Sequence, residues 1–458
     1  MKVDRQLLEK YNVPVPRYTS YPPANYFIDD FDYSSAIKSI EASNEHEPRN
    51  MSFYLHIPFC SQLCYYCGCY THITKNKKVM DDYVKTLKKE ILIYKDLLDK
   101  NRKISQIHWG GGTPNYLPLS QVQEIMTLIK DNFKFTDDPE IAIECHPAHL
   151  DYEYIDGLVS AGFNRISIGV QDFSEDVLNK VNRALPMMPV EDIVAYAKSK
   201  GLSVNLDLIY GLPGQSVESF SETVEKAVTL NVDRFAVFSY AHVPWVKPHQ
   251  KLLEKYYLPD AESKIQMFEA AYEIFTKNGY VSIGLDHFAK PDDELNIALQ
   301  NRQLCRNFQG YCTRRTTGQV YAFGVSAISQ LTGAYLQNTK DLTQYTKSVN
   351  DNRLPFVKAY FLNNEEIITG RLISEIMCNR YVNFEDFAAK NQISLDGLKN
   401  IVVFDEEKLK IFSSEGLIIY SGNELEVTQK GMFFLRNIAS SFDPLLISKS
   451  DKKFSKSL

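Results

Sequence analysis

Short apolar runs alternate with segments of helical periodicity through the first two thirds of the chain. The runs typical of buried strands occupy residues 51–57, 105–111, 140–146, 164–170, 203–211, 233–241 and 280–284. The segments that repeat apolar residues at the spacing of an amphipathic helix cover residues 79–100, 119–133, 174–184, 189–201 and 216–231. Gly162 and Gly201 stand where helix C-caps belong. Alternating strands and helices predict an α/β fold with a parallel sheet, and six or seven such units predict a partial or full (β/α) barrel.

The pattern of predicted elements changes near residue 360. Short helical segments are followed by a small hairpin and a last helix, and the stretch SEGLIIYSGNELEVTQKG resembles the wing of a winged-helix unit. We interpret this region as a cap on the barrel rather than a DNA-binding unit, because the acidic chain offers no obvious recognition face. The sequence thus predicts a barrel over residues 49–355 and a smaller, mostly helical, winged-helix-like cap domain over residues 356–458.

Composition narrows the class of protein. The chain has 458 residues, 44% of them hydrophobic, and a net charge of −6, which does not suggest a nucleic-acid binder. The first residues contain no apolar leader, and no uninterrupted apolar stretch is long enough to span a membrane. We therefore expect a cytoplasmic protein, in which thiols stay reduced and a cysteine cluster is a metal or catalytic site rather than a disulfide framework.

The most informative stretch is FYLHIPFCSQLCYYCGCYTHI, which begins at Phe53. Cys60, Cys64 and Cys67 are spaced C-x3-C-x2-C directly after the first predicted strand, so their loop should lie at the catalytic end of the barrel. Three thiolates suit an iron–sulfur cluster that leaves one iron open to a substrate or cofactor. Zinc is one alternative, but a second cysteine pair is missing from the sequence. Cys69 as a fourth ligand is another, and it requires a cramped loop.

Two further segments point to a bound ligand. The glycines of GGGTP, residues 110–114, allow the backbone to approach a ligand closely, although a tight βα turn explains them equally well. Glu144 ends the third predicted strand, where its carboxylate can accept hydrogen bonds from two hydroxyl groups or form a salt bridge at the rim.

The three-cysteine motif resembles that of the radical S-adenosylmethionine (SAM) superfamily, and the longer sequence narrows the resemblance. The segments YLHIPFC, HWGGGTPNYL, FNRISIGVQDF, DLIYGLPGQ, DHFAKPDDEL, RNFQGY and GVSAIS together are similar to oxygen-independent coproporphyrinogen III oxidases. The likeness extends from YNVPVPRYTSYP near the start to KGMFFLRNIASSFD near the end. This set of motifs is highly specific, whereas the cysteine motif alone indicates only the superfamily.

The resemblance implies a [4Fe-4S] cluster on Cys60, Cys64 and Cys67, with the amino and carboxylate groups of one SAM on the open iron. It also implies a second SAM molecule in the same pocket, for which Gln171, Arg183 and Asp207 match the family's positions. The SAM-binding residues implied by the family are Tyr54, Tyr66, Gly111, Gly112, Thr113, Glu144, Gln171, Arg183, Asp207, Ala241 and Ile328. Without the family, Tyr54, Tyr66, Ala241 and Ile328 would be interpreted as core residues.

The resemblance also implies catalytic residues. Cys69 ends the CGC sequence that separates these oxidases from related haem chaperones, and we expect catalysis to need it. Tyr54 is expected to tune hydrogen bonding around SAM, and Phe308 and Gln309 match a segment near the active site. Arg314 and Arg315 are our own candidates for contacts with substrate propionates, with an exposed loop as the alternative. His146 departs from the acidic residue that the family has there.

The implied reaction is the decarboxylation of the ring A and B propionates of coproporphyrinogen III to vinyl groups. It gives protoporphyrinogen IX and is started by a 5′-deoxyadenosyl radical made from SAM. The expected partners are this substrate and an electron donor such as flavodoxin or ferredoxin, and we expect a monomer that binds neither nucleic acid nor membrane. Residues 1–48 are expected to close over the active site, or to pack on the barrel as a Pro-rich loop. The alternatives are a radical-SAM haem chaperone, a haem-degrading enzyme of the same fold, and a DNA-binding regulator.

Overall fold

The computed structural model describes residues 4–307, 310–446 and 454. Its centre is one twelve-stranded sheet in the order β16-β15-β14-β13-β1-β4-β5-β6-β7-β8-β10-β9. Six consecutive strands of this sheet run parallel: β1 (Met51–Ile57), β4 (Lys103–Gly111), β5 (Lys134–Cys145), β6 (Arg165–Gln171), β7 (Ser203–Tyr210) and β8 (Arg234–Ser239). The prediction of an α/β fold with a partial barrel is confirmed.

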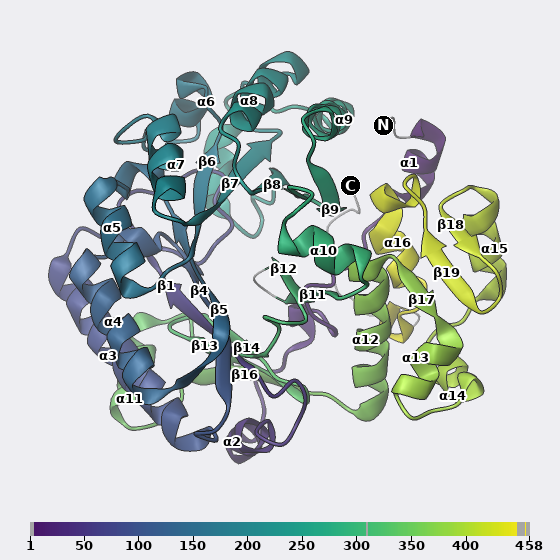
Figure 1. Ribbon diagram of the computed structural model, residues 1–458, viewed down its shortest axis with the longest axis horizontal. Helices are drawn as coiled ribbons and strands as arrows, with labels where there is room; N and C mark the ends of the chain where they lie inside the picture. The colour runs from purple at the N-terminus through teal and green to yellow at the C-terminus, as the bar shows by residue number, and fades with distance from the viewer. Residues whose placement is uncertain (1–3, 308–309, 447–453, 455–458) are drawn as a thin grey trace.

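Helices cover the outer face of the parallel strands, as Figure 1 shows along its left side and top. They are α3 (Lys77–Leu97), α4 (Leu119–Asn132), α5 (Tyr152–Ala161), α6 (Glu175–Lys180), α7 (Val190–Ser199), α8 (Val217–Thr229) and α9 (Ala261–Lys277). The strands read as apolar runs because both of their faces are covered: in β1, Phe53, Leu55 and Ile57 are fully buried. Gly162 caps α5 in the left-handed conformation with φ 92°, as its position in the sequence predicts.

Further strands, most of them antiparallel to their neighbours, extend the sheet at both edges. Beside β1 lie β13 (Gln319–Phe323), which is parallel to it, and then β14 (Ile328–Gln330), β15 (Ala334–Asn338) and β16 (Phe356–Phe361), with α11 (Leu342–Asn350) between the last two in sequence. Beside β8 lie β10 (His287–Ala289) and β9 (Val281–Gly284). The run 280–284 is therefore a strand but not a seventh βα unit, because its short connection to β10 forces antiparallel pairing.

A second core lies in the C-terminal region, on the right of Figure 1. Its elements are α12 (Asn364–Asn379), β17 (Tyr381–Asn383), α13 (Phe384–Lys390), α14 (Leu395–Ile401), α15 (Glu406–Ser414), β18 (Ile418–Tyr420), β19 (Glu424–Val427) and α16 (Leu435–Ser440). The strands form a small antiparallel sheet in the order β17-β19-β18. This arrangement of short helices and a hairpin agrees with the predicted winged-helix-like unit, while the boundary at residue 356 stays a prediction.

The N-terminal segment joins the two cores. Helix α1 (Arg5–Tyr11) lies against the C-terminal region (Figure 1), and Leu7, Leu8, Tyr18 and Tyr21 belong to its apolar core. Farther along, α2 (Tyr33–Ala42) adds Ala36 and Ile40 to the core of the barrel. Among the described residues, no helix combines the length and the apolar character that a membrane crossing requires.

Candidate active site

A cavity of about 590 Å³ opens at the carboxyl ends of the parallel strands and continues into the barrel. Its strand-borne walls come from alternate positions, since every second side chain of a strand points into the barrel. The lining residues at these positions are Gln106 and His108 of β4, Glu140 and Glu144 of β5, Arg165, Ser167, Gly169 and Gln171 of β6, Asn205, Asp207 and Ile209 of β7, and Arg234, Ala236 and Phe238 of β8. Gly111, Cys145 and Ser239, the last residues of β4, β5 and β8, also line the cavity. Loops after the strands complete the cavity, as in other barrels of this kind.

The cysteine loop follows β1 and forms one wall of the cavity. Cys60, Cys64, Cys67 and Cys69 all line it. The loop is closed at its base by the short parallel pair β2 (Phe59–Cys60) and β3 (His72–Ile73), and Tyr65 N–H donates to the Val181 carbonyl at 2.9 Å. The sequence therefore folds here into a loop that turns its thiols inward.

The thiols differ in how easily they ionise. Burial raises the pKa of Cys60 to about 11 and also raises the pKa of Cys64. Hydrogen bonds from Cys69 lower the pKa of Cys67 to about 6. Because only thiolates bind iron, loading the site must release protons from the first two cysteines.

The donor set fits a cluster better than a single ion. Within the described residues, no three Cys, His, Asp or Glu side chains are arranged to hold one metal ion. In an iron–sulfur cluster each cysteine binds its own iron, so its thiolates stand farther apart than the ligands of one zinc ion. Gly112 leaves the room that this loop needs, since a Cβ there would lie 3.0 Å from Cys60 Sγ and 2.6 Å from the Pro58 carbonyl oxygen.

The glycine turn packs directly on the cysteine loop. Gly112 N–H donates to the Ile57 carbonyl at 2.8 Å, and Thr113 N–H donates to the Phe59 carbonyl at 2.9 Å. Thr113 Oγ1 also lies 3.3 Å from Cys60 Sγ, and Gly111 has φ 115°, which favours glycine. All three residues line the cavity. The N–H groups of Gly112 and Thr113 are already engaged in these backbone hydrogen bonds. A ligand can therefore contact the carbonyl groups of the turn and occupy the space beside it, but it cannot accept hydrogen bonds from these two donors.

Glu144 projects into the cavity from the end of β5. His108 Nε2 lies 3.1 Å from Glu144 Oε1, and Gly110 makes room for the carboxylate, which a Cβ at that position would approach to 2.9 Å. The ring of Tyr54 stacks on His108 with centroids 6.1 Å apart. Tyr54 itself does not contribute to the cavity wall, so the structure places it behind His108.

Gln171 and Arg183 are two polar residues of the cavity wall. Arg183 donates to Tyr66 Oη at 2.8 Å, to the Gly169 carbonyl, and to Cys64 Sγ at 3.6 Å. No carboxylate of the described residues pairs with it. Gln171 has the strained value of φ 70°, and its side-chain oxygen is buried with no hydrogen-bond partner in the described part of the chain. Orphaned groups of this kind indicate a ligand that completes them.

Asp207 lies deeper in the barrel. Its carboxylate accepts hydrogen bonds from Ser167 Oγ at 3.1 and 3.2 Å and from Asn205 Nδ2 at 2.7 Å. Burial, with a smaller contribution from Glu144, raises the pKa of Asp207 to about 7. A cationic ligand group is the natural partner of such a carboxylate, because it favours the ionised form.

The remaining predicted residues have mixed outcomes. Ala241 lines the cavity, whereas Ile328 begins β14 and is not part of the wall. Phe308 and Gln309 lie outside the described residues. His146 accepts a hydrogen bond from Ala148 N–H, and burial lowers its pKa to about 2, so it acts as a neutral cap of the turn that follows β5.

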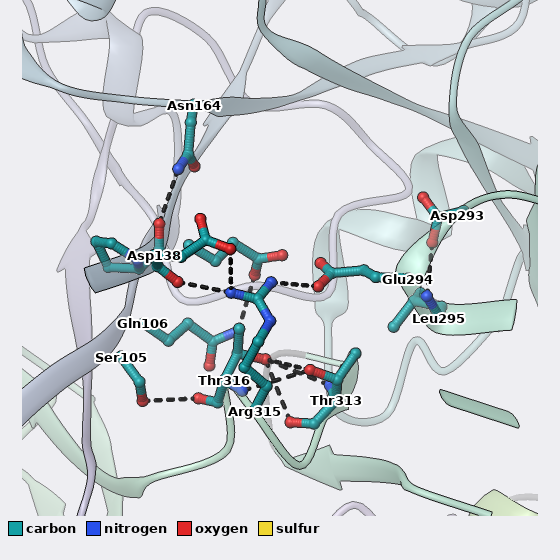
Figure 2. A network of polar contacts seen from close by, with 12 residues as sticks. Ser105, Gln106, Asp138, Asn164, Asp293, Glu294, Leu295, Thr313, Arg315 and Thr316 are labelled. Atoms are coloured by element: carbon teal, nitrogen blue, oxygen red, sulfur yellow. Dashed lines mark hydrogen bonds and ion pairs between the residues drawn. The ribbon is translucent and has the colours of Figure 1, made fainter. Parts of the chain in front are cut away.

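The two arginines proposed for the propionates lie elsewhere. Arg315 is paired with Asp138 at 2.7 Å and with Glu294 at 2.5 Å, in the polar network of Figure 2, and Arg314 is paired with Glu375 at 2.7 Å. Neither belongs to the cavity wall. The prediction is wrong because the turn between β12 (Gly310–Thr313) and β13 lies at the amino end of β13, opposite the cysteine loop.

Sequence reasoning missed several polar residues of the cavity. His108, Arg165, Asn205 and Arg234 line it, and so does Arg17 of the N-terminal segment. The signal was present for four of them, since they occupy inward positions of the predicted strands. Only Arg17 carries no periodic signal.

Known proteins match the chain over nearly its whole length. The model of the radical SAM superfamily matches residues 54–227. The oxygen-independent coproporphyrinogen III oxidase of Synechocystis sp. is 41% identical over 98% of this chain and 96% of its own, and that of Escherichia coli is 37% identical over the same shares. A solved structure of coproporphyrinogen III oxidase from Escherichia coli, described as a radical SAM enzyme, superposes with a TM-score of 0.88 at 35% identity and covers 97% of this chain and 99% of its own. The chain belongs to the family of oxygen-independent coproporphyrinogen III oxidases.

Proposed function

We propose that the protein converts coproporphyrinogen III into protoporphyrinogen IX without oxygen, by decarboxylating the ring A and B propionates to vinyl groups. The observation that carries this proposal is the meeting of three inward-facing thiols and buried charges without counter-charges in one cavity. Such a cavity suits a charged cofactor beside a metal cluster, and the family membership names the reaction. A porphyrin precursor is accordingly the substrate.

The residues present fit a [4Fe-4S] cluster and SAM. Cys60, Cys64 and Cys67 would hold the cluster. When bound, the two cofactors supply the one-electron chemistry that removes a hydrogen atom from a propionate side chain, after which loss of CO2 and one electron leaves a vinyl group.

Four side chains are assigned to SAM. Arg183 would bind a methionine carboxylate, since its guanidinium has no carboxylate partner among the described residues, and Asp207 would take an ammonium group. Glu144, oriented by His108, would accept the ribose hydroxyls. The orphaned oxygen of Gln171 would accept a further hydrogen bond. The distribution of these groups over three neighbouring strands and the loop after α6 supports room for two SAM molecules.

Cys69 is proposed as a catalytic thiol. It is exposed and lines the cavity beside Cys67, so it is positioned to meet the substrate. The one-electron donor is an external protein such as a flavodoxin or a ferredoxin, and the enzyme is proposed to work as a monomer.

The test is an anaerobic assay of the reconstituted and reduced protein with SAM and coproporphyrinogen III. The expected products are 5′-deoxyadenosine and protoporphyrinogen IX, detected by chromatography. Formation of 5′-deoxyadenosine without protoporphyrinogen would support the assigned cofactors but indicate that the substrate is haem or another tetrapyrrole. Neither product, with an intact cluster, would reject the proposal.

A further inference from the structure

The segment that follows β8 covers the outer side of the cysteine loop. Gln250 Nε2 donates to the Tyr66 carbonyl at 3.0 Å, His249 Nε2 lies 2.9 Å from the Cys67 carbonyl, and Lys247 Nζ donates to the Cys69 carbonyl at 2.9 Å. Three contacts thus join residues 247–250 to the backbone of the cysteine loop, and one of them reaches the proposed cluster ligand Cys67. We call residues 242–257 the cover segment.

The inner side of the cover segment is firmly anchored. Leu253 is fully buried in a small apolar core that also contains Tyr240, with Tyr65 and Tyr66 of the cysteine loop packed against it. Gln250 is 1% exposed, and its side-chain oxygen accepts a hydrogen bond from Val243 N–H at 2.6 Å. The segment is therefore a fixed part of the wall.

The outer side of the cover segment is unusually apolar. Trp245 is 75% exposed, Tyr257 is 71% exposed, and Val246 and Leu252 are also exposed. A large aromatic side chain left in water on an anchored segment is typical of an interface, where tryptophan and tyrosine contribute most to binding.

The charge of the same side is positive. Lys251 and Lys255 are exposed there, whereas Lys247 points to the cysteine loop, and the segment's one carboxylate, Glu254, contacts His242 at 3.2 Å. The chain as a whole carries a net charge of −6. A local excess of lysine on an acidic protein directs association toward an acidic partner.

We propose that the outer side of the cover segment is the docking surface for a small, acidic one-electron carrier protein. This inference rests on the proposed function, which requires a single electron from outside the protein. One electron would pass from the reduced carrier to the cluster that Cys60, Cys64 and Cys67 would hold, and no proton or group would be transferred with it. His249 connects the Cys67 carbonyl to the cover segment, so the carrier docks over a short bonded route to the cluster ligands.

The test uses a bacterial flavodoxin and two charge-reversal variants. The first is Lys251→Glu with Lys255→Glu, on the cover segment. The matched control is Lys390→Glu with Lys410→Glu, which makes the same change of charge in the C-terminal region. Neither pair contacts the cysteine loop. Trp245→Ser tests the apolar part of the surface.

We expect the cover-segment variant to bind flavodoxin about tenfold more weakly and with less dependence on salt, because rim charges govern association and its salt sensitivity. Stopped-flow reduction of the cluster by reduced flavodoxin should slow by a similar factor, while reduction by dithionite stays unchanged. Trp245→Ser should weaken binding by roughly tenfold or more, as the loss of an interface anchor does. The control pair should behave as the unmodified protein.

Three outcomes would overturn the proposal. One is equal loss of binding in the control and the cover-segment variant, which would indicate a general charge effect. Another is failure of the unmodified enzyme to bind either a flavodoxin or a ferredoxin. The third is sedimentation that shows Trp245→Ser dissociating a dimer while carrier binding is kept, which would make the surface an interface between two copies. Cluster reduction by flavodoxin without conversion of coproporphyrinogen would reject the proposed function and leave the docking surface standing.

Discussion

Buried arginines lie at both ends of the barrel, and they differ in how their charges are paired. At the amino end of the strands, Arg234 contacts Asp293 at 2.7 Å and Glu294 at 3.0 Å. Arg315, in the network of Figure 2, also contacts Glu294. At the carboxyl end, Arg183 is equally buried, yet its contacts are a tyrosine oxygen, a carbonyl oxygen and a thiol.

The presence or absence of a carboxylate partner separates arginines that stabilise the fold from an arginine that is suited to bind a ligand. Removing one partner of a buried ion pair strongly destabilises the protein, because the other charge stays in the interior without a counter-charge. A buried guanidinium with only neutral partners lacks a counter-charge in the folded protein from the start, so its removal leaves no buried charge unpaired. Its natural use is to bind an anion, and substitution there should affect binding more than stability.

The largest effect is expected at the carboxyl end. Cys67→Ala should abolish the cluster and all SAM cleavage, because one of the three thiolates is lost. Iron content and visible absorbance after anaerobic reconstitution measure the first, and release of 5′-deoxyadenosine measures the second. Cys305→Ala removes a thiol outside the cavity and should keep both. A Cys67→Ala protein with normal iron content would show that the cluster has other ligands.

Next come the two arginines, compared directly. Arg234→Ala should lower the free energy of unfolding of the cluster-free protein by about 3–5 kcal/mol, since it leaves Asp293 and Glu140 buried without a full counter-charge. Arg183→Ala should lower it by about 1 kcal/mol or less, yet weaken SAM binding by roughly 30-fold or more. Urea unfolding and equilibrium SAM binding measure the two quantities. Equal losses of stability would remove the distinction between the two ends.

A smaller effect is expected from the titration of Asp207. Its pKa is raised from 3.8 to about 7, so folding favours its protonated form. Its contribution to stability is therefore full below about pH 4 and is lost as the pH rises through about 7. Asp207→Asn should remove this decline, so that the cluster-free variant is more stable than the unmodified protein at pH 8 but not at pH 4. Thermal unfolding across this range measures the difference.

The groups around Asp207 decide whether that result is specific. Ser167 and Asn205 donate to its carboxylate, Glu144 raises its pKa and His287 lowers it. Glu144→Gln is the matched control, since it should shift the decline toward lower pH without removing it. The Asn variant should also bind SAM more weakly, because a neutral amide is a poor partner for an ammonium group. A parallel decline in the variant and the unmodified protein would assign the titration to another group.

The sequence predicted the barrel and the chemistry of the open end for one physical reason. Strands, helices and the cysteine loop are local patterns, and residues that follow a strand must lie at its carboxyl end. For this reason Cys60 and Glu144 were found, whereas Asp207, which lies inside β7, was predicted only by the resemblance to the family. His108 and Arg165 were missed although they alternate with buried residues along predicted strands. The two-residue alternation was used to locate the strands but not to identify which of their side chains point inward.

The ion pairs between residues far apart in the chain could not be predicted from the sequence. Arg234 and Asp293 are far apart in the chain, and nothing local says that they meet. Arg315 illustrates the same limit. Its place next to the motif RNFQGY suggested the active site, but the hairpin of β11 (Leu304–Asn307) and β12 carries the chain away from the cysteine loop before it reaches this residue.

The smallest effect is expected at Arg315. Its side chain is 48% exposed, and exposed ion pairs contribute at most about 1 kcal/mol. Arg315→Gln should therefore change the free energy of unfolding by no more than this, and should leave KM for coproporphyrinogen III and the affinity for SAM unchanged. A rise in KM with normal stability would contradict the placement of Arg315 and restore it as a propionate contact. It would also show that the amino end of the barrel takes part in binding, which would erase the contrast between the two ends.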